Sequence, residues 1–162
     1  VMLDIEPYIS DSWKENPEEY MDRYISCMKK GYKFAQKNHL RTAICIPRHY
    51  DNQGLTSGLE ELIKETCDEV AVMNYSCGNE IEAIRTEAAL SEKYGKELHC
   101  ILEFQEVGKH GLTENKTYRN KGIDNAKETW EKLQKEYKNI NVTRDYHWSR
   151  PVREMLEEKN AD

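Results

Sequence analysis

Segments typical of β-strands alternate with segments typical of α-helices along the whole of this 162-residue chain. Short runs rich in β-branched and aromatic residues indicate strands, and apolar residues repeated every three or four positions indicate helices. The expected strands are 1–8, 41–51, 69–76, 97–106 and 140–148. The expected helices are 17–38, 57–67, 79–95, 122–139 and 150–160. Such alternation predicts βαβ units and a parallel sheet.

Local signals mark where some of these elements begin and end. Asn16 is a candidate N-cap, with Pro17 at the first helical position and acidic residues after it. Pro47 ends the second expected strand, and Gly95 is suited to close the third helix. The long irregular stretch at 107–122 follows a strand, where α/β folds place functional loops.

Two α/β architectures fit this order of elements, an open doubly wound sheet and a (β/α)8 barrel. The first strand-to-helix turn has neither GxGxxG nor GxxxxGK[ST], so a nucleotide-binding doubly wound sheet lacks its main motif. The spacing of the strands fits the repeat of roughly 30 residues expected for a barrel. We therefore predict an α/β fold in which residues 1–162 form one partial domain, about strands four to eight of a TIM barrel. On this interpretation the N-terminal half of the barrel precedes Val1.

The composition excludes several classes of partner. The formal net charge is −6 and basic residues are scattered among acidic ones, so we expect no nucleic-acid partner. No apolar run approaches the ~20 residues that span a bilayer, so we expect a soluble protein without a membrane partner, either cytoplasmic or secreted. The five cysteines include no CxxC pair, which favours reduced thiols.

Polar and aromatic side chains follow each expected strand. Because active sites of parallel α/β folds form at the carboxyl ends of strands, these residues should converge on one rim. They are Asp4, Glu6 and Tyr8; Arg48, His49, Tyr50 and Asp51; Asn74 and Tyr75; Glu103, Gln105 and Glu106; and Asp145, Tyr146, His147 and Trp148. Aromatic rings can stack on sugar faces while carboxylates handle protons and developing positive charge, which indicates a carbohydrate site.

Three short motifs at these strand ends, "LDIEPY", "VMNYS" and "LEFQ", carry a resemblance to known families. The first two resemble the chitinase-like family 18 glycoside hydrolases, which have a D-x-E motif after strand four and M-x-Y at strand six. "IEP" and "LEFQ" are similar to barrel glycosidases with glutamates after strands four and seven. The most similar pattern belongs to an uncharacterised bacterial barrel family with "DIEPY", "IPxWYD" and "MxYR", matched here by "DIEPY", "IPRHYD" and "MNYS".

These resemblances imply two sets of catalytic roles. The chitinase-like pattern implies Glu6 as general acid, Asp4 orienting a substrate acetamide and Tyr75 as hydrogen-bond partner. Met2 and Ser76 depart from that pattern, which favours the second set. In the second set Glu6 is acid/base and Glu103 is the nucleophile, with carboxyl groups about 5 Å apart.

The expected function is hydrolysis of a glycosidic bond, with a carbohydrate substrate and no cofactor. We expect substrate contacts from Tyr8, Arg48, Tyr50, Asp51, Asn74, Tyr75, Gln105, His147 and Trp148. A catalytically inactive barrel that binds a glycan is the alternative function.

Other interpretations of single residues also remain open. Asp4 and Glu6 could be salt-bridged inside the barrel, Glu103 could pair with Arg48, and His99 fits a core histidine with satisfied hydrogen bonds. A metal site at His49, Asp51, His147 and Glu6 is disfavoured because the chain has no HxH or HExxH. The isolated chain would be inactive unless it associates with the other half of the barrel or with itself.

Overall fold

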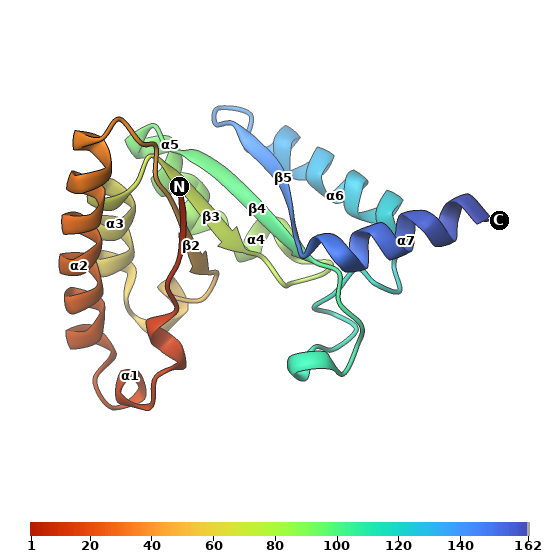
Figure 1. Cartoon of the computed structure of the whole chain (residues 1–162), viewed down its shortest axis with the longest axis horizontal. Coiled ribbons are helices and arrows are strands. Elements are labelled where there is room, and N and C mark those ends of the chain that lie inside the picture. The colour runs from red at the N-terminus through yellow and green to blue at the C-terminus, as the bar shows by residue number, and fades with distance from the viewer. Residues whose placement is uncertain (162) are drawn as a thin grey trace.

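The computed structural model describes residues 1–161 and shows one five-stranded sheet in which all neighbouring strands are parallel (Figure 1). The strands are β1 (Met2–Asp4), β2 (Ala43–Pro47), β3 (Glu69–Met73), β4 (Glu97–Glu103) and β5 (Val142–His147). Their order in the sheet is β1-β2-β3-β4-β5. The predicted α/β fold with a parallel sheet is therefore confirmed. No strand order reversal occurs among these residues, whereas a doubly wound sheet reverses at a switch point.

Helices connect the strands and gather along one side of the sheet (Figure 1). They are α1 (Asp11–Glu15), α2 (Pro17–Lys37), α3 (Thr56–Thr66), α4 (Glu80–Ala83), α5 (Arg85–Tyr94), α6 (Ile123–Glu136) and α7 (Ser149–Ala161). Short 3-10 helices lie at Pro7–Ile9, Asp51–Gln53 and Lys109–Gly111. No helix among the described residues is long and apolar enough to cross a membrane.

The helix boundaries mostly follow the predicted signals. The Asn16 side chain accepts a hydrogen bond from the Glu19 N–H at the start of α2, and Gly95 ends α5 in the left-handed region with φ 62°. The single helix expected at 79–95 is divided into α4 and α5, because Ile84 has a non-helical φ of −125°. The Ile84 side chain is fully buried, so packing holds it at this break.

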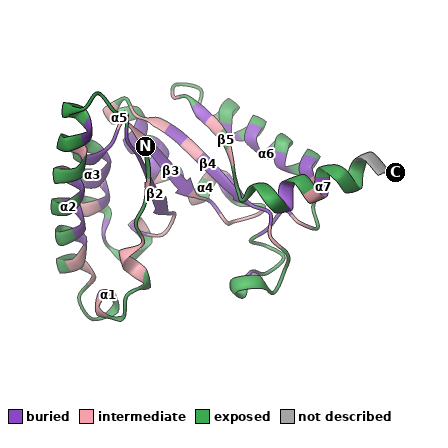
Figure 2. Ribbon diagram, viewed as in Figure 1, coloured by how far each residue is buried: buried purple, intermediate pink, exposed green. Residues whose placement is uncertain are grey.

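The two faces of the sheet have different environments. Alternate residues such as Ile44, Val70 and Leu98 pack against the helices in the main core, as the period of two predicts. On the opposite face a small apolar cluster contains Cys45, Ala71 and Ile101. Figure 2 shows the central strands as buried, whereas α7 is largely exposed. The second face carries no covering helix.

Both edges of the sheet are open. Neither β1 nor β5 has a second neighbouring strand among residues 1–161, so the five strands do not close into a barrel on their own. Large exposed hydrophobic side chains gather near these edges: Val1, Met2, Ile5 and Ile9 at the β1 end and Tyr146 and Trp148 at the β5 end.

Candidate functional site

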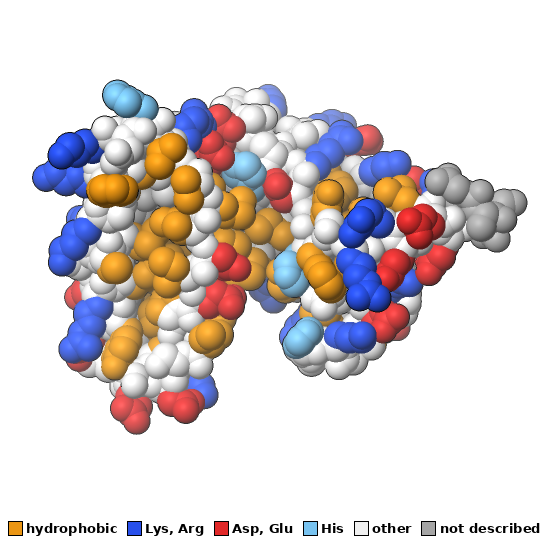
Figure 3. All heavy atoms as spheres, viewed as in Figure 1, with side chains coloured by type: hydrophobic (Ala, Val, Ile, Leu, Met, Phe, Trp, Pro, Cys, Tyr) orange, Lys and Arg blue, Asp and Glu red, His pale blue; other side chains and the backbone are white. Residues whose placement is uncertain are grey.

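The candidate site is a pocket of about 710 Å³ at the carboxyl end of the helix-free sheet face. Figure 3 shows the surface hollowed between the N-terminal half of the molecule and the loop after β4, with acidic and histidine side chains beside the hollow. The lining residues come from all five strands, from the stretches that follow them and from the 107–122 loop. They are Met2, Asp4, Glu6, Cys45, Met73, Tyr75, Ile101, Glu103, Gln105, His110, Gly111, Leu112, Lys116, Tyr146, His147 and Trp148.

The stretch after β1 contributes two carboxylates to this pocket. Asp4 and Glu6 both line it, since alternate residues of an extended chain point the same way. The Tyr8 hydroxyl donates a hydrogen bond to the Glu6 carboxylate. Burial, together with this carboxylate, raises the pKa of Tyr8, so its phenol stays protonated and able to donate. Neither acid forms an ion pair with another described residue, contrary to the salt-bridged interpretation.

Glu103 and His147 form a hydrogen-bonded pair at the β4–β5 side of the pocket. The Glu103 side chain is 2% exposed, and its Oε2 atom lies 2.9 Å from Nδ1 of His147. Its Oε1 atom accepts 2.8 Å hydrogen bonds from the backbone N–H groups of Phe104 and Gln105. Burial alone raises the pKa of Glu103, but the bonds from His147 and the two N–H groups outweigh it and lower that pKa. Glu103 is therefore ionised and bonded at both oxygens.

This arrangement gives Glu103 a partner other than the predicted one. Both Glu103 oxygens accept hydrogen bonds, and the paired side chain is His147 rather than Arg48. The buried carboxylate holds the His147 ring in place, and its role as a nucleophile stays a prediction.

Aromatic rings form much of the remaining wall. The Tyr75 ring centroid lies 6.2 Å from that of His147, with an interplanar angle of 30°. Burial, followed by the Glu103 carboxylate, raises the pKa of the Tyr75 phenol, so the hydroxyl stays protonated. Tyr146 and Trp148 remain 49% and 45% exposed at the rim. These rings provide apolar surface next to hydrogen-bonding groups.

Several predicted contact residues lie outside the pocket. Tyr50 is fully buried in the main core, 5.5 Å from the Trp13 ring centroid, because the chain turns inward after β2. Asn74 is 1% exposed, and its amide donates to the Glu80 carbonyl on the helix side of the sheet. Neither can touch a ligand in the pocket, which corrects both predictions.

Three further residues of the predicted set also lie away from the pocket lining. Asp51 accepts a hydrogen bond from Thr86 on α5, and Arg48 does not line the pocket. Tyr8 reaches the pocket only through its bond to Glu6, while its ring packs on His49. The four groups of the disfavoured metal site are thus divided, since only Glu6 and His147 line the pocket.

The 107–122 loop supplies pocket residues that were not individually predicted. His110, Leu112 and Lys116 all line the pocket. The sequence marks this loop as functional by its length and its place after a strand, but an irregular loop has no period that shows which side chains face inward. Of the predicted contacts, Tyr75, Gln105, His147 and Trp148 do line the pocket.

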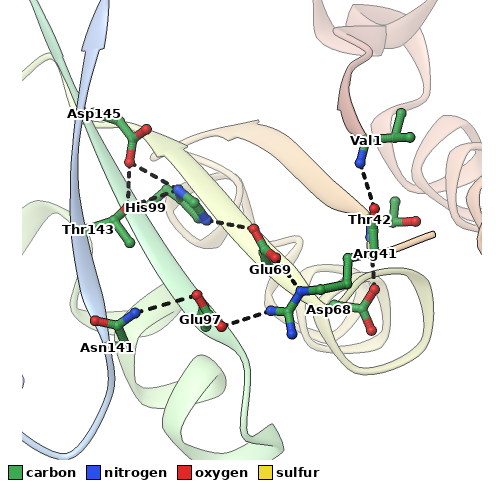
Figure 4. Close-up of polar contacts among 10 residues, drawn as sticks. All are labelled: Val1, Arg41, Thr42, Asp68, Glu69, Glu97, His99, Asn141, Thr143 and Asp145. Atoms are coloured by element: carbon green, nitrogen blue, oxygen red, sulfur yellow. Dashed lines mark hydrogen bonds and ion pairs between the residues drawn. The ribbon is translucent and has the colours of Figure 1, made fainter. Parts of the chain in front are cut away.

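The amino end of the same sheet face carries a closed polar network (Figure 4). Nε2 of His99 lies 2.9 Å from Glu69, and Nδ1 lies 3.0 Å from Asp145. The Arg41 guanidinium bonds Glu69 at 2.7 Å and Glu97 at 2.8 Å. The predicted satisfied histidine is confirmed at His99.

Two other groups of polar residues are explained by structural roles. Glu69, Glu97 and His99 are close enough to hold a metal ion, but the Arg41 guanidinium already forms ion pairs with both carboxylates. A second cavity of about 680 Å³ lies between α4 and α6. Its Glu80 accepts bonds from the Gly78 N–H and the Tyr118 hydroxyl, which fasten the loop after β3.

Comparison of the chain with protein-family models, with curated proteins and with solved structures found no match. A proposal for its function therefore depends on the geometry and chemistry of the pocket.

Proposed function

We propose that this chain belongs to a carbohydrate-active (β/α)8-barrel protein that hydrolyses a glycosidic bond, with Glu6 as the general acid. The observation that supports it best is the pocket itself. Glu6, Asp4 and three aromatic residues (Tyr75, Tyr146 and Trp148) line one cavity at the carboxyl ends of the strands. Carboxylates beside aromatic surface are what recognition and cleavage of a sugar require.

The sequential order of the strands supports the barrel. A TIM barrel has eight strands, so the five here leave three to be supplied by further βα units. Exposed hydrophobic residues such as Val1 and Ile5 lie at the open β1 edge, where an added strand would cover them. We propose such a segment, rather than a second copy, as the closing partner, because two five-stranded sheets would give ten strands.

Glu6 is suited to donate a proton to the leaving oxygen. It is half-buried in the pocket wall, and the Tyr8 hydroxyl holds one of its oxygens in place. General acid catalysis needs a carboxyl group positioned within hydrogen-bond reach of the departing oxygen. Tyr8 is in turn held by ring contacts with His49 and Tyr50, so the support extends into the core.

Asp4 is a better candidate than Glu103 for the second carboxylate near the reacting sugar. Glu103 is buried and accepts hydrogen bonds at both oxygens, whereas Asp4 is exposed to the pocket. Tyr75 lines the same pocket as Asp4 and Glu6. We propose that Asp4 and Tyr75 hydrogen-bond the sugar next to the scissile bond, while the rim aromatics stack on it.

The test is the turnover of a panel of p-nitrophenyl glycosides and oligosaccharides by the complete polypeptide and its Glu6→Gln variant. The amide cannot donate the acid's proton, so we expect turnover to fall about 10²–10⁴-fold. Titration calorimetry should show oligosaccharide binding nearly unchanged. Glu106→Gln is the matched control, because this exposed glutamate at the same end of the sheet lies outside the pocket lining.

Two results would overturn the proposal. If the Glu6→Gln variant keeps wild-type turnover, Glu6 is not the general acid. Glycan binding by the wild-type protein without turnover of any member of the panel would establish the inactive glycan-binding barrel instead.

A further inference from the structure

Two histidines on the same sheet face each pair with a carboxylate, but only one keeps a ring nitrogen free. His99 is bonded at both nitrogens, by Asp145 and Thr143 at Nδ1 and by Glu69 at Nε2. His147 is bonded at Nδ1 alone, by Glu103 with Gln105 beside it. Among the described residues, Nε2 of His147 has no hydrogen-bond partner, and the side chain is 48% exposed along the pocket.

Glu103 is held rigidly enough to set the state of the His147 ring. Its Oε1 atom is bound to two backbone N–H groups at 2.8 Å, so the carboxylate cannot rotate away. The other oxygen accepts the hydrogen on Nδ1, which leaves the lone pair of the neutral ring on Nε2. A carboxylate that fixes the tautomer of a histidine and stabilises the imidazolium is the arrangement found in catalytic triads.

We propose that His147 is a catalytic base, which takes a proton from the attacking water at Nε2, and that Glu103 is its positioning residue. This role rests on the proposed glycosidase function and assigns the base that acts with Glu6. Asp4 in β1 and Glu6 just after it line the pocket from one edge of the sheet, and His147 in β5 lines it from the other. Acid and base would thus stand on opposite walls, with the sugar and the water between them.

The step balances without a further reactant. The water oxygen bonds to the anomeric carbon while one water proton passes to Nε2 of His147. The bond from that carbon to the leaving oxygen breaks, and the Glu6 proton passes to the leaving oxygen. Afterwards the imidazolium releases its proton to solvent and the Glu6 carboxylate takes one up. A single displacement of this kind inverts the anomeric configuration, whereas nucleophilic attack by a carboxylate followed by water retains it.

The charges around His147 determine the expected pH dependence. The hydrogen bond with Glu103, followed by the charges of Glu103, Asp4 and Glu6, raises the pKa of His147, although burial opposes this. The ionisable groups that line the pocket with it are Asp4, Glu6, Cys45, Tyr75, Glu103, His110, Lys116 and Tyr146. A base must be neutral to act, so kcat/KM should rise with pH through a pKa above the usual value of about 6.5.

The experiment measures pH profiles of kcat/KM and the anomer first formed, for wild type and three variants of the complete polypeptide. His147→Gln should lower turnover about 10²–10⁴-fold, and its kcat/KM should no longer show the rise with pH (the rising limb of the profile). Glu103→Gln should move that limb to lower pH, since a neutral amide stabilises the imidazolium less. His99→Gln is the matched control and should keep both the limb and the wild-type rate. The first product should have the inverted configuration, as seen by NMR.

The outcomes separate this inference from the proposed function. Two results would refute the role of His147: a His147→Gln variant whose kcat/KM still rises with pH as in the wild type, or a first product with retained configuration. If Glu6→Gln is inactive in the same experiments, the proposed glycosidase function is kept. Absence of wild-type turnover on every glycoside would refute the function and the base together. An NMR titration of the histidines supplies a readout that needs no substrate, because Glu103→Gln must lower the pKa of His147.

Discussion

The two ends of the helix-free sheet face use the same residue types in opposite ways. At the amino end, Arg41, His99 and their carboxylate partners bond to one another until few polar atoms are left over. At the carboxyl end, Asp4 and the free nitrogen of His147 face an open pocket. In parallel α/β folds the first end supports stability and the second supports chemistry. Whether such a side chain can bind or react with a ligand thus depends on how many of its polar atoms remain without a hydrogen-bond partner.

A few buried polar groups in the core also lack partners. Side-chain oxygen atoms that are buried without a hydrogen-bond partner among the described residues belong to Tyr24, Thr42, Tyr50, Asn74, Glu87 and Ser91. Unpaired buried polar groups cost stability. Glu87 has both of its carboxyl oxygens in this set.

The largest effect should come from Glu87, whose carboxyl group is fully buried on α5 without a partner. Burial raises its pKa from 4.5 to about 7. Stability should therefore fall as pH rises from about 4.5 and level off above about 7, by about 3 kcal/mol. Glu87→Gln should remove this slope, measured by urea unfolding across that range. Exposed Glu92→Gln on the same helix is the control, and an unchanged slope in Glu87→Gln would contradict the assignment.

A smaller effect is expected from breaking the closed network with His99→Gln. This removes the cation between Glu69 and Asp145, so unfolding free energy should fall by about 1–3 kcal/mol while turnover is kept. The hydrogen bond to Asp145 is the chief reason that the pKa of His99 is raised. Its stabilisation is therefore complete below about pH 6.5 and is lost as pH rises through the folded pKa. Urea unfolding at pH 5.5 and pH 9 measures this loss. If His99→Gln lowers the free energy of unfolding equally at both pH values, the ion pairs of His99 do not stabilise the fold.

The smallest change in stability should follow His147→Gln. This side chain is 48% exposed, and the glutamine amide can still donate a hydrogen bond to the buried Glu103 carboxylate, so the free energy of unfolding should change by less than about 1 kcal/mol. Thermal and urea unfolding at pH 7 give the value. If His147→Gln lowers the free energy of unfolding more than His99→Gln does, the carboxyl end of the sheet face, rather than the amino end, contributes more to stability.

Most of the fold could be predicted because its signals are local. Asn16 with Pro17 marks the start of α2, and the alternation in β4 separates Leu98 and Leu102 from Ile101 and Glu103. The break at Ile84 could not be predicted, because the helical period continues through it and tertiary packing decides the interruption. The short helix α1, which lies before the predicted N-cap at Asn16, was not predicted.

The site could be predicted only in part. Residues on extended backbone, such as Asp4, Glu6 and Tyr75, reach the pocket as their positions indicate. Asn74 follows the same alternation, which puts it on the helix side with Val70 and Val72 and away from the pocket. Tyr50 lies beyond the last paired residue of β2, where the chain turns and packing chooses the direction of the side chain, so its burial in the core could not be predicted.

The sequence by itself determined the order of strands and helices and the face on which each strand residue lies, because a period of two or of 3.6 acts between near neighbours. The tertiary structure alone decided which polar atoms are satisfied. His147 meets Glu103 from 44 positions away, and His99 meets Asp145 from 46 positions away. Such partners are chosen by strand register and by the curvature of the sheet, so two histidines that look alike in sequence become one closed contact and one open site.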